Sequence, residues 1–211
     1  MNKLFRRINN RIVLYNYKKE INKKNHYVNN GTSWNLDIEI QGRNNKIEIA
    51  KGCSLRNLKI IIKGDNHQLI LKENVNIKAG ILWLEGSSNK IKIGSFTTIE
   101  SAHIASIESN CVVKIGEDCM LSDKIVFRNG DSHSIIDLES DQRINPSGNI
   151  IIDDHVWIGS NVTILKNVHI KSNSIIGINS LVTKDVDQNT LVAGSPAIKL
   201  RQNINWKREL I

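Results

Sequence analysis

The sequence predicts an all-β protein built as a parallel β-solenoid, a fold in which short strands wind into stacked coils. Two repeats support this prediction. In residues 151–186 an aliphatic side chain returns every sixth position, and a looser repeat of twenty-two residues precedes it. The sixfold positions are Ile152, Ile158, Ile164, Ile170, Ile176 and Val182. An amphipathic helix would space its apolar residues by three or four, and a half-buried strand by two. Because six is a multiple of two, strands broken by regular corners keep the same side chains inward, and three hexads close one triangular coil.

Two further positions of each hexad indicate a strand followed by a corner. Four residues after each aliphatic stand small or β-branched residues: Val156, Val162, Val168, Ser174, Ser180 and Val186. Three residues after it stand His155, Asn161, Asn167, Asn173, Asn179 and Asp185. These polar types are the ones that best tolerate a left-handed backbone conformation at a turn. We therefore expect a corner at each of them.

The upstream repeat predicts coils of the same kind with one enlarged corner. Its aligned inward positions are Ile47, Leu69, Ile91 and Val113, and then Ile49, Leu71, Ile93 and Ile115. Gly42, Gly64 and Gly86 precede them in one register, each followed by turn-forming residues. We expect one solenoid over residues 29–194, with a loop at 128–149, a C-terminal tail at 195–211 and short helical segments at both chain ends.

The composition favours a cytoplasmic protein of one domain. The 211 residues hold three cysteines without metal-type spacing, and no apolar run reaches the roughly 18 residues of a membrane span. Cys53 and Cys119 share their repeat position with Val75 and Thr97, so we expect them inside the coils.

The net charge of +8 is concentrated in residues 1–28, which hold eight lysines and arginines against one glutamate. Leu4, Ile8, Ile12 and Tyr15 have helical spacing there, so we expect a helix with a basic face. It would cap the solenoid or pack in an oligomer. The alternative is peripheral contact with an anionic membrane surface at the inner face. No aromatic platform or motif accompanies the charge, so nucleic acid is not an expected partner.

One polar segment interrupts the hexads. It reads RNGDSHSIIDLESDQRINPSG from Arg128 to Gly148, and it contains a single histidine, His133, between Asp131 and Asp137. Loops on a rigid scaffold are frequent sites of function, and histidine is the side chain best suited to proton transfer near neutral pH. His133 is therefore the candidate general base.

Four segments carry a family resemblance: CMLSDKIVFRNGDSHSIID, DDHVWIGSNVTILKNV, IIGINSLVTKDV and LVAGSPAIKL. They resemble the left-handed parallel β-helix acyltransferases of the hexapeptide-repeat superfamily, and most closely the O-acetyltransferases of bacterial capsule, sialic acid and other surface polysaccharides. The order D-x-H-x-I, H-V-W-I-G, A-G-S-P-A is specific as a combination. The resemblance is close over residues 110–210, whereas 30–109 match only as a solenoid.

The resemblance implies an acetyl-CoA-dependent enzyme that forms homotrimers, with its sites in the grooves between neighbouring solenoids. His133 takes the place of the family's general base, and Trp157 lies where the thiol arm of acetyl-CoA meets the acceptor. Ala193 and Gly194 begin the segment at the nucleotide end of the cofactor. The chain has Ile178-Asn179-Ser180-Leu181 where the family more often has alanine, glycine, serine and valine. This difference alters the expected packing beside the CoA groove at Asn179.

The implied mechanism is direct transfer without a covalent acyl-enzyme. His133 removes the proton of a sugar hydroxyl, and the alkoxide attacks the thioester carbonyl. Asp131 and Asp137 are candidates to orient the imidazole. Lys184 and Arg201 are candidates to bind the CoA phosphates, because cationic side chains bind phosphate by charge and arginine also by its two-pronged geometry. Trp206 is expected to anchor a terminal helix.

Three alternatives stay open at this stage. The same fold supports N-acetylation of an amino or nucleotide-linked sugar, and it also supports a non-catalytic glycan-binding solenoid. A zinc enzyme would need three histidines, but only His133 and His155 stand twenty-two residues apart, and the loop between them breaks the register. No metal is therefore expected.

Overall fold

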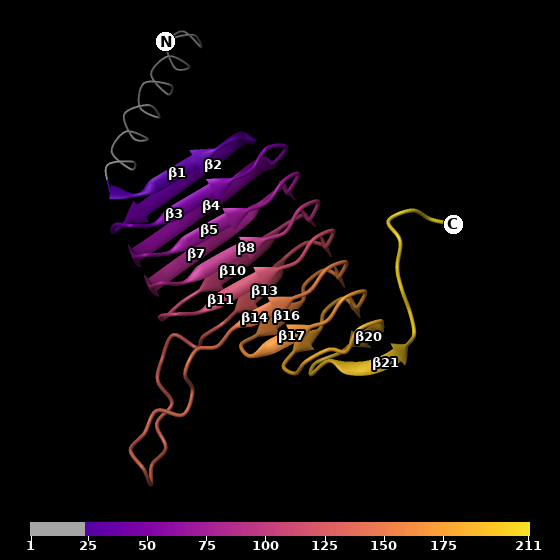
Figure 1. The fold of residues 1–211 in the computed structure, drawn as a ribbon. Helices are drawn as coiled ribbons and strands as arrows, with labels where there is room; N and C mark the ends of the chain where they lie inside the picture. Colours follow the sequence, from indigo (N-terminus) through magenta and orange to yellow (C-terminus); the bar gives the residue numbers. More distant parts are fainter. Residues whose placement is uncertain (1–23) are drawn as a thin grey trace, which may run out of the picture.

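A computed structural model describes residues 24–211; the predicted basic N-terminal helix lies outside these described residues. The chain winds into a stack of coils (Figure 1). Its strands form a seven-stranded sheet, which is one face of the stack, and a fourteen-stranded sheet, which provides two more because residues 54–55 pair with one strand and residues 58–65 with another. We call these faces A, B and C. Within residues 24–211 every strand pairing between coils is parallel; the last two strands pair antiparallel, and one isolated antiparallel bridge lies in the loop between Ile136 and Arg143. The predicted parallel solenoid is confirmed.

The strands divide among the faces as follows. Face A holds β1 (His26–Asn29), β3 (Lys46–Ile49), β5 (Gln68–Leu71), β8 (Lys90–Ile93), β11 (Val112–Ile115), β14 (Ile150–Ile152) and β17 (Val168–Ile170). Face B holds β7 (Gly80–Ser87), β10 (Ala102–Ser106), β13 (Ile125–Arg128), β16 (Thr163–Leu165) and β19 (Leu181–Val182). Face C holds β6 (Asn76–Ile77), β9 (Thr98–Ile99), β12 (Met120–Leu121), β15 (Trp157–Ile158), β18 (Ile175–Ile176), β20 (Thr190–Ala193) and β21 (Ile198–Gln202). Two long strands, β2 (Thr32–Gln41) and β4 (Ser54–Asp65), turn the corner from face C into face B.

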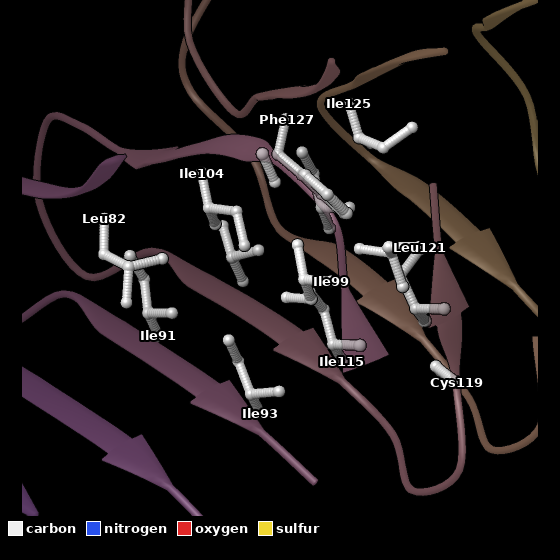
Figure 2. Packing of buried hydrophobic residues seen from close by; sticks show 14 of the residues in the cluster. Leu82, Ile91, Ile93, Ile99, Ile104, Ile115, Cys119, Leu121, Ile125 and Phe127 are labelled. Carbon is white, nitrogen blue, oxygen red and sulfur yellow. The ribbon is translucent and has the colours of Figure 1, made fainter. Parts of the chain in front are cut away.

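The core is a set of aliphatic columns that run along the solenoid axis. All six aliphatics of the hexads from Ile152 to Val182 are buried, as is each residue four places later. In the upstream coils Ile47 pairs with Leu69, and Leu69 pairs with Ile91, so like side chains stack. Figure 2 shows such side chains converging on the interior from the three faces. Each fully buried aliphatic side chain contributes about 1.5–3 kcal/mol, which makes these columns the main stabilising feature.

The predicted corners are confirmed at five of six hexads. His155, Asn161, Asn167, Asn173 and Asn179 all adopt φ between 56° and 62°. Asp185 is the exception, since it is not among the residues with positive φ. Its carboxylate instead accepts a hydrogen bond from the His169 N–H at 2.8 Å. At this corner the side chain adds a link to the preceding coil beside the main-chain hydrogen bond from the Val186 N–H to the His169 carbonyl oxygen at 2.9 Å.

The enlarged corner of the upstream coils is also present. Gly42, Gly64 and Gly86 stack with φ of 130°, 115° and 106°. A Cβ on Gly64 would lie 1.8 Å from the carbonyl oxygen of Gly86, so glycine is required by space as well as by conformation. Two buried polar side chains beside these glycines accept hydrogen bonds from main-chain N–H groups of the next coil. Asn45 accepts from the His67 N–H, and His67 accepts from the Asn89 N–H. This satisfies donors that the wide turn would leave unpaired.

His67 makes the stability of this corner sensitive to pH. Its Nδ1 accepts the Asn89 N–H at 3.2 Å and its Nε2 lies 3.2 Å from the Lys63 carbonyl oxygen, which together require the neutral ring. Burial lowers the pKa of His67. The unfolded chain therefore takes up a proton as pH falls below about 6.5 while the folded chain resists it, so stability is lost in that direction.

The variant His67→Asn places an asparagine at position 67, as at positions 45 and 89 of the same column. We expect it to lose less stability than the wild type as the pH falls. The measurement is the melting temperature from about pH 7.5 to about pH 5. Wild type should lose more stability than the variant over this interval. Parallel curves for the two proteins would contradict the role of His67.

The chain ends differ from the expectation in two respects. The first strand, β1, begins at His26, before residue 29. At the C-terminus the expected short helix is wrong: residues 198–202 form β21, which pairs antiparallel with β20, and no helix follows it in the described tail. The backbone donors and acceptors of β20 at the last coil would otherwise face solvent, and β21 satisfies them. No helix among the described residues is long and apolar enough to cross a lipid bilayer.

Candidate active site

The loop with His133 leaves the solenoid between β13 on face B and β14 on face A, and it projects beyond the coils (Figure 1). In a three-sided coil, the corner between faces A and B lies opposite face C. The loop is therefore built on the edge of the solenoid that is farthest from Trp157, which belongs to β15 on face C.

Asn145 organises the base of the loop. Its side chain is almost completely buried, at 6% exposure. Its Nδ2 donates to the Asp131 carboxylate and to the His133 carbonyl oxygen, both at 2.8 Å. Its Oδ1 accepts the Ile135 N–H at 2.7 Å. One amide group thus holds the backbone at residues 133 and 135, on either side of Ser134.

Two ion pairs tie this base to the coils. Arg143 makes a two-pronged contact with the Glu108 carboxylate, at 2.6 and 2.9 Å, and the hydrogen bonds from Arg143 lower the pKa of Glu108. Lys166 lies 2.6 Å from Asp131. The hydrogen bonds from Lys166 and then Asn145 lower the pKa of Asp131, which stays ionised. Such charge-assisted bonds are stronger than neutral ones and fix the loop root.

His133 itself is exposed, and no described residue hydrogen-bonds either nitrogen of its ring. The expected contact between Asp131 and the imidazole is not formed, because Lys166 and Asn145 occupy that carboxylate. Asp137 is engaged by the N–H groups of residues 139 and 140 in a local turn. In this chain the loop presents the imidazole to solvent, and its backbone rather than a carboxylate sets its position.

Asn145 holds the backbone beside His133, and sequence reasoning missed it. With His133 as the predicted general base, we expect Asn145→Ala to lower kcat about 10- to 100-fold, because a reacting group displaced by about 1 Å loses that much. The solenoid should melt as before, and hydrogen exchange should rise in residues 130–147. Glu139→Ala in the same loop is the control. Unchanged exchange with a full loss of activity would contradict a positioning role.

Trp157 is 37% exposed, and its outward side begins a row on face C. In register with it stand Ile175, Leu191 and Arg201, on β18, β20 and β21. The three steps span roughly 14 Å at the usual strand spacing. Two predicted binding residues, Trp157 and Arg201, therefore lie on one face and are joined by an apolar track.

The other predicted binding residues fall at two different corners. Asn179 and Gly194 come together at the corner of faces C and B, where the Gly194 N–H donates to the Ser180 Oγ at 3.1 Å and Ala193 precedes it on β20. Lys184 follows β19 at the corner of faces B and A, the same edge of the solenoid as the His133 loop. The structure thus separates the predicted residues into a face C group and a loop-edge group.

The C-terminal tail closes one side of face C. Trp206 is 5% exposed and stacks on His155 with ring centroids 4.1 Å apart. His155 Nδ1 lies 2.7 Å from Asp118, and Arg208 reaches the same carboxylate at 3.0 Å. Partial burial raises the pKa of Asp118, but the hydrogen bonds from His155 and Arg208 outweigh it and lower the pKa overall. Trp206 is the predicted anchor, although of an extended tail rather than a helix.

The cysteines occupy the core as expected. Cys53, Cys111 and Cys119 are free and buried, and burial raises the pKa of Cys119 to about 12.

No group of three histidine, cysteine or acidic side chains is gathered within residues 24–211 in a way that would hold a metal. His155 is engaged by Asp118 and Trp206.

Comparisons with known proteins agree with this architecture. No family model matches the chain. The polysialic acid O-acetyltransferase of Escherichia coli O1:K1 / APEC is 40% identical over 138 residues, covering 65% of this chain and 44% of that protein. The enzyme of the same name from Neisseria meningitidis is 36% identical over 129 residues, covering 61% and 59%. The chain thus spans about half the length of these curated relatives.

Two solved structures match over most of the chain. The polysialic acid-specific acetyltransferase NeuO has a TM-score of 0.77 and 36% identity, covering 88% of this chain and 83% of that one. The polysialic acid O-acetyltransferase OatWY has a TM-score of 0.69 and 30% identity, covering 88% and 93%. The fold is therefore the left-handed parallel β-helix of hexapeptide-repeat proteins. Within that class, this chain belongs to the hexapeptide-repeat acetyltransferase family that includes NeuO and OatWY.

Proposed function

We propose that this protein is an acetyl-CoA-dependent O-acetyltransferase that acetylates a sugar hydroxyl of a bacterial surface polysaccharide or its precursor. His133 acts as the general base. The observation that carries the proposal is an exposed imidazole without a structural partner, on a loop whose root is fixed by Asn145 and two ion pairs. Relatives named for acetylation of polysialic acid support the acceptor class.

In the proposed reaction, His133 removes the proton of the acceptor hydroxyl as its oxygen attacks the thioester carbonyl carbon of acetyl-CoA. The carbon–sulfur bond then breaks, and the CoA thiolate leaves and is protonated. Main-chain N–H groups are the proposed donors to the oxyanion. Positioned general bases of this kind contribute about 10²- to 10⁴-fold in rate.

The donor is proposed to lie along the row from Trp157 to Arg201. Trp157 and the apolar residues after it suit the thiol arm, and Arg201 and the Ala193–Gly194 segment suit the nucleotide end. Asn179 lines the same corner. Guanidinium groups bind phosphate by two parallel hydrogen bonds. Lys184 belongs to the loop edge. Its proposed role is to contact the phosphates of the acetyl-CoA that is bound on face C of a neighbouring subunit.

A complete site is proposed to need two copies of the chain. His133 rises from the corner opposite face C, so its own Trp157 lies on the far side of the solenoid. In a homotrimer, the loop edge of one subunit faces face C of the next, and His133 meets the neighbour's donor row. Because acetyl-CoA is a cytoplasmic metabolite, we place the reaction in the cytoplasm. The basic N-terminus is proposed to contact the inner membrane face.

The test is release of CoA from acetyl-CoA in the presence of surface glycans and amino sugars. Turnover on a glycan that offers only hydroxyl groups, with base-labile acetyl esters in the product, is the expected result. Turnover restricted to free amino groups would move the assignment to N-acetylation. Glycan binding without turnover or CoA binding in calorimetry would favour the non-catalytic solenoid.

A further inference from the structure

A hollow near the N-terminal end of the solenoid is separate from the proposed reaction centre. It has a volume of about 540 Å³ and is lined by Trp34, Arg56, Asn57 and Lys78. It lies where β2 and β4 turn from face C into face B. A second hollow of about 190 Å³ shares Trp34 and Arg56 with it. Indole and guanidinium groups thus form the floor of a continuous depression.

The Trp34 indole is left exposed by the described residues 24–211. It is 68% exposed, although it lies within β2 in register with Arg56 rather than at a loop tip. A large apolar side chain held in solvent by a paired strand is informative, because strands normally turn such residues inward. The flat face of an indole suits the apolar face of a sugar ring.

Of the two cations beside it, Arg56 is available to a carboxylate, whereas Lys78 is already ion-paired. Among the described residues no acidic group pairs with Arg56, which is exposed. Lys78 follows at the same interval of twenty-two residues, with its ammonium 2.7 Å from Glu100. The Asn57 Oδ1 accepts a hydrogen bond from Asn35 at 2.8 Å, so the Asn57 NH₂ group keeps its donors. The depression offers a two-pronged cation, an amide donor and an aromatic surface.

This depression continues to Trp157. Lys78 also lines a cavity of about 470 Å³ that reaches Thr98, Met120 and Trp157 along face C. Five strand-to-strand steps separate β2 from β15, a distance of roughly 24 Å at the usual spacing. Arg208 of the tail forms part of its wall. The two cavities adjoin at Lys78 and together extend from Trp34 to Trp157, on the side of Trp157 away from Arg201. Glu100, the ion-pair partner of Lys78, also lines the second cavity.

We propose that the Trp34–Arg56 hollow is a second binding site for the acceptor, and that the acceptor is a polymer of carboxylated sugars. The Trp34 indole packs against one sugar ring, and Arg56 binds the carboxylate of that sugar. A more distant sugar of the same polymer occupies the cavity at Trp157. The inference rests on the proposed function and names its acceptor more closely. It predicts that long acceptors bind more tightly than short ones, because the second contact is intramolecular.

The experiment measures binding of polysialic acid to the full chain by calorimetry, with neutral dextran of equal length beside it. Trp34→Ala and Arg56→Gln should each weaken the binding of polysialic acid about tenfold, the first by loss of the aromatic surface that packs on the sugar ring and the second by loss of a charge-assisted contact. Lys114→Gln, which removes one charge from face A, is the matched control and should bind as wild type. Melting temperature and mass in solution should be unchanged in all three variants.

Kinetics separate this inference from the proposed function. With a short acceptor the Trp34 and Arg56 variants should keep the wild-type kcat and KM, and with a long acceptor their KM should rise. The inference is overturned if Lys114→Gln weakens binding equally, if dextran binds as well as polysialic acid, or if wild type turns over short acceptors without binding polysialic acid. It is also overturned if either variant changes the oligomeric mass, since a second copy would then cover the hollow. Absence of turnover on every acceptor, with polysialic acid binding retained, would refute the reaction and leave the site standing.

Discussion

His133→Ala is expected to lower kcat by at least about a hundredfold, since a positioned general base contributes about 10²- to 10⁴-fold. The KM for acetyl-CoA should change little, because the proposed donor row lies on face C and not on the loop. The folded state should be unaffected, since the imidazole is exposed and makes no hydrogen bond with a described residue. The measurement is CoA release at saturating acetyl-CoA across a pH series.

Glu139→Gln, also exposed in the loop, is the matched control and should retain activity. Full activity in His133→Ala would remove His133 from the mechanism. A lower melting temperature would instead show that the loss comes from folding.

Gly64→Ala is expected to destabilise the solenoid by about 3 kcal/mol or more, combining positive-φ strain with a backbone clash. The φ at this position is +115°, and the added Cβ would lie 1.8 Å from the Gly86 carbonyl oxygen. A backbone oxygen cannot swing away as a flexible side chain can, so the stacked corner must open. Urea unfolding measures the loss.

Gly194→Ala separates the two causes. Gly194 has a similar φ of +105°, but the nearest atom to its added Cβ is 3.4 Å away. It should therefore lose only the conformational part, about 1–2 kcal/mol. Equal losses in the two variants would show that the stacking of Gly64 on Gly86 adds nothing.

The coils were predictable because their determinants are local and periodic. Each inward aliphatic meets its own counterpart in the next coil, so a period visible in the chain becomes a column in space. The same holds for the left-handed corners, where the intrinsic tolerance of asparagine decides the conformation. Asp185 departs from the rule because its carboxylate binds the His169 N–H, and a hydrogen bond between coils has no signal in the hexad itself.

The loop and the tail depend on contacts that no period reveals. Asn145 bonds residues ten to fourteen positions away, and its only local signal is the Asn-Pro pair, which marks a turn. Lys166 resembles any surface lysine until the fold brings it to Asp131. Trp206 stands out as an apolar residue in a polar tail, but its partner His155 lies fifty-one residues earlier. Composition predicts an anchor there, whereas only the folded chain identifies what it anchors to.

The constant register of the upstream coils has a consequence for how such a chain can change in length. Residues 42–64 and 64–86 meet their successors in the same way, glycine over glycine and aliphatic over aliphatic. Inserting or deleting one unit of twenty-two residues there would leave every remaining interface as it is. The distance from Trp34 to Trp157 would change by one strand spacing, roughly 4.8 Å, while the His133 loop and the donor row would stay unaltered. The number of coils thus sets the distance between the proposed second acceptor site at Trp34 and the proposed reaction centre, without changing the residues of either.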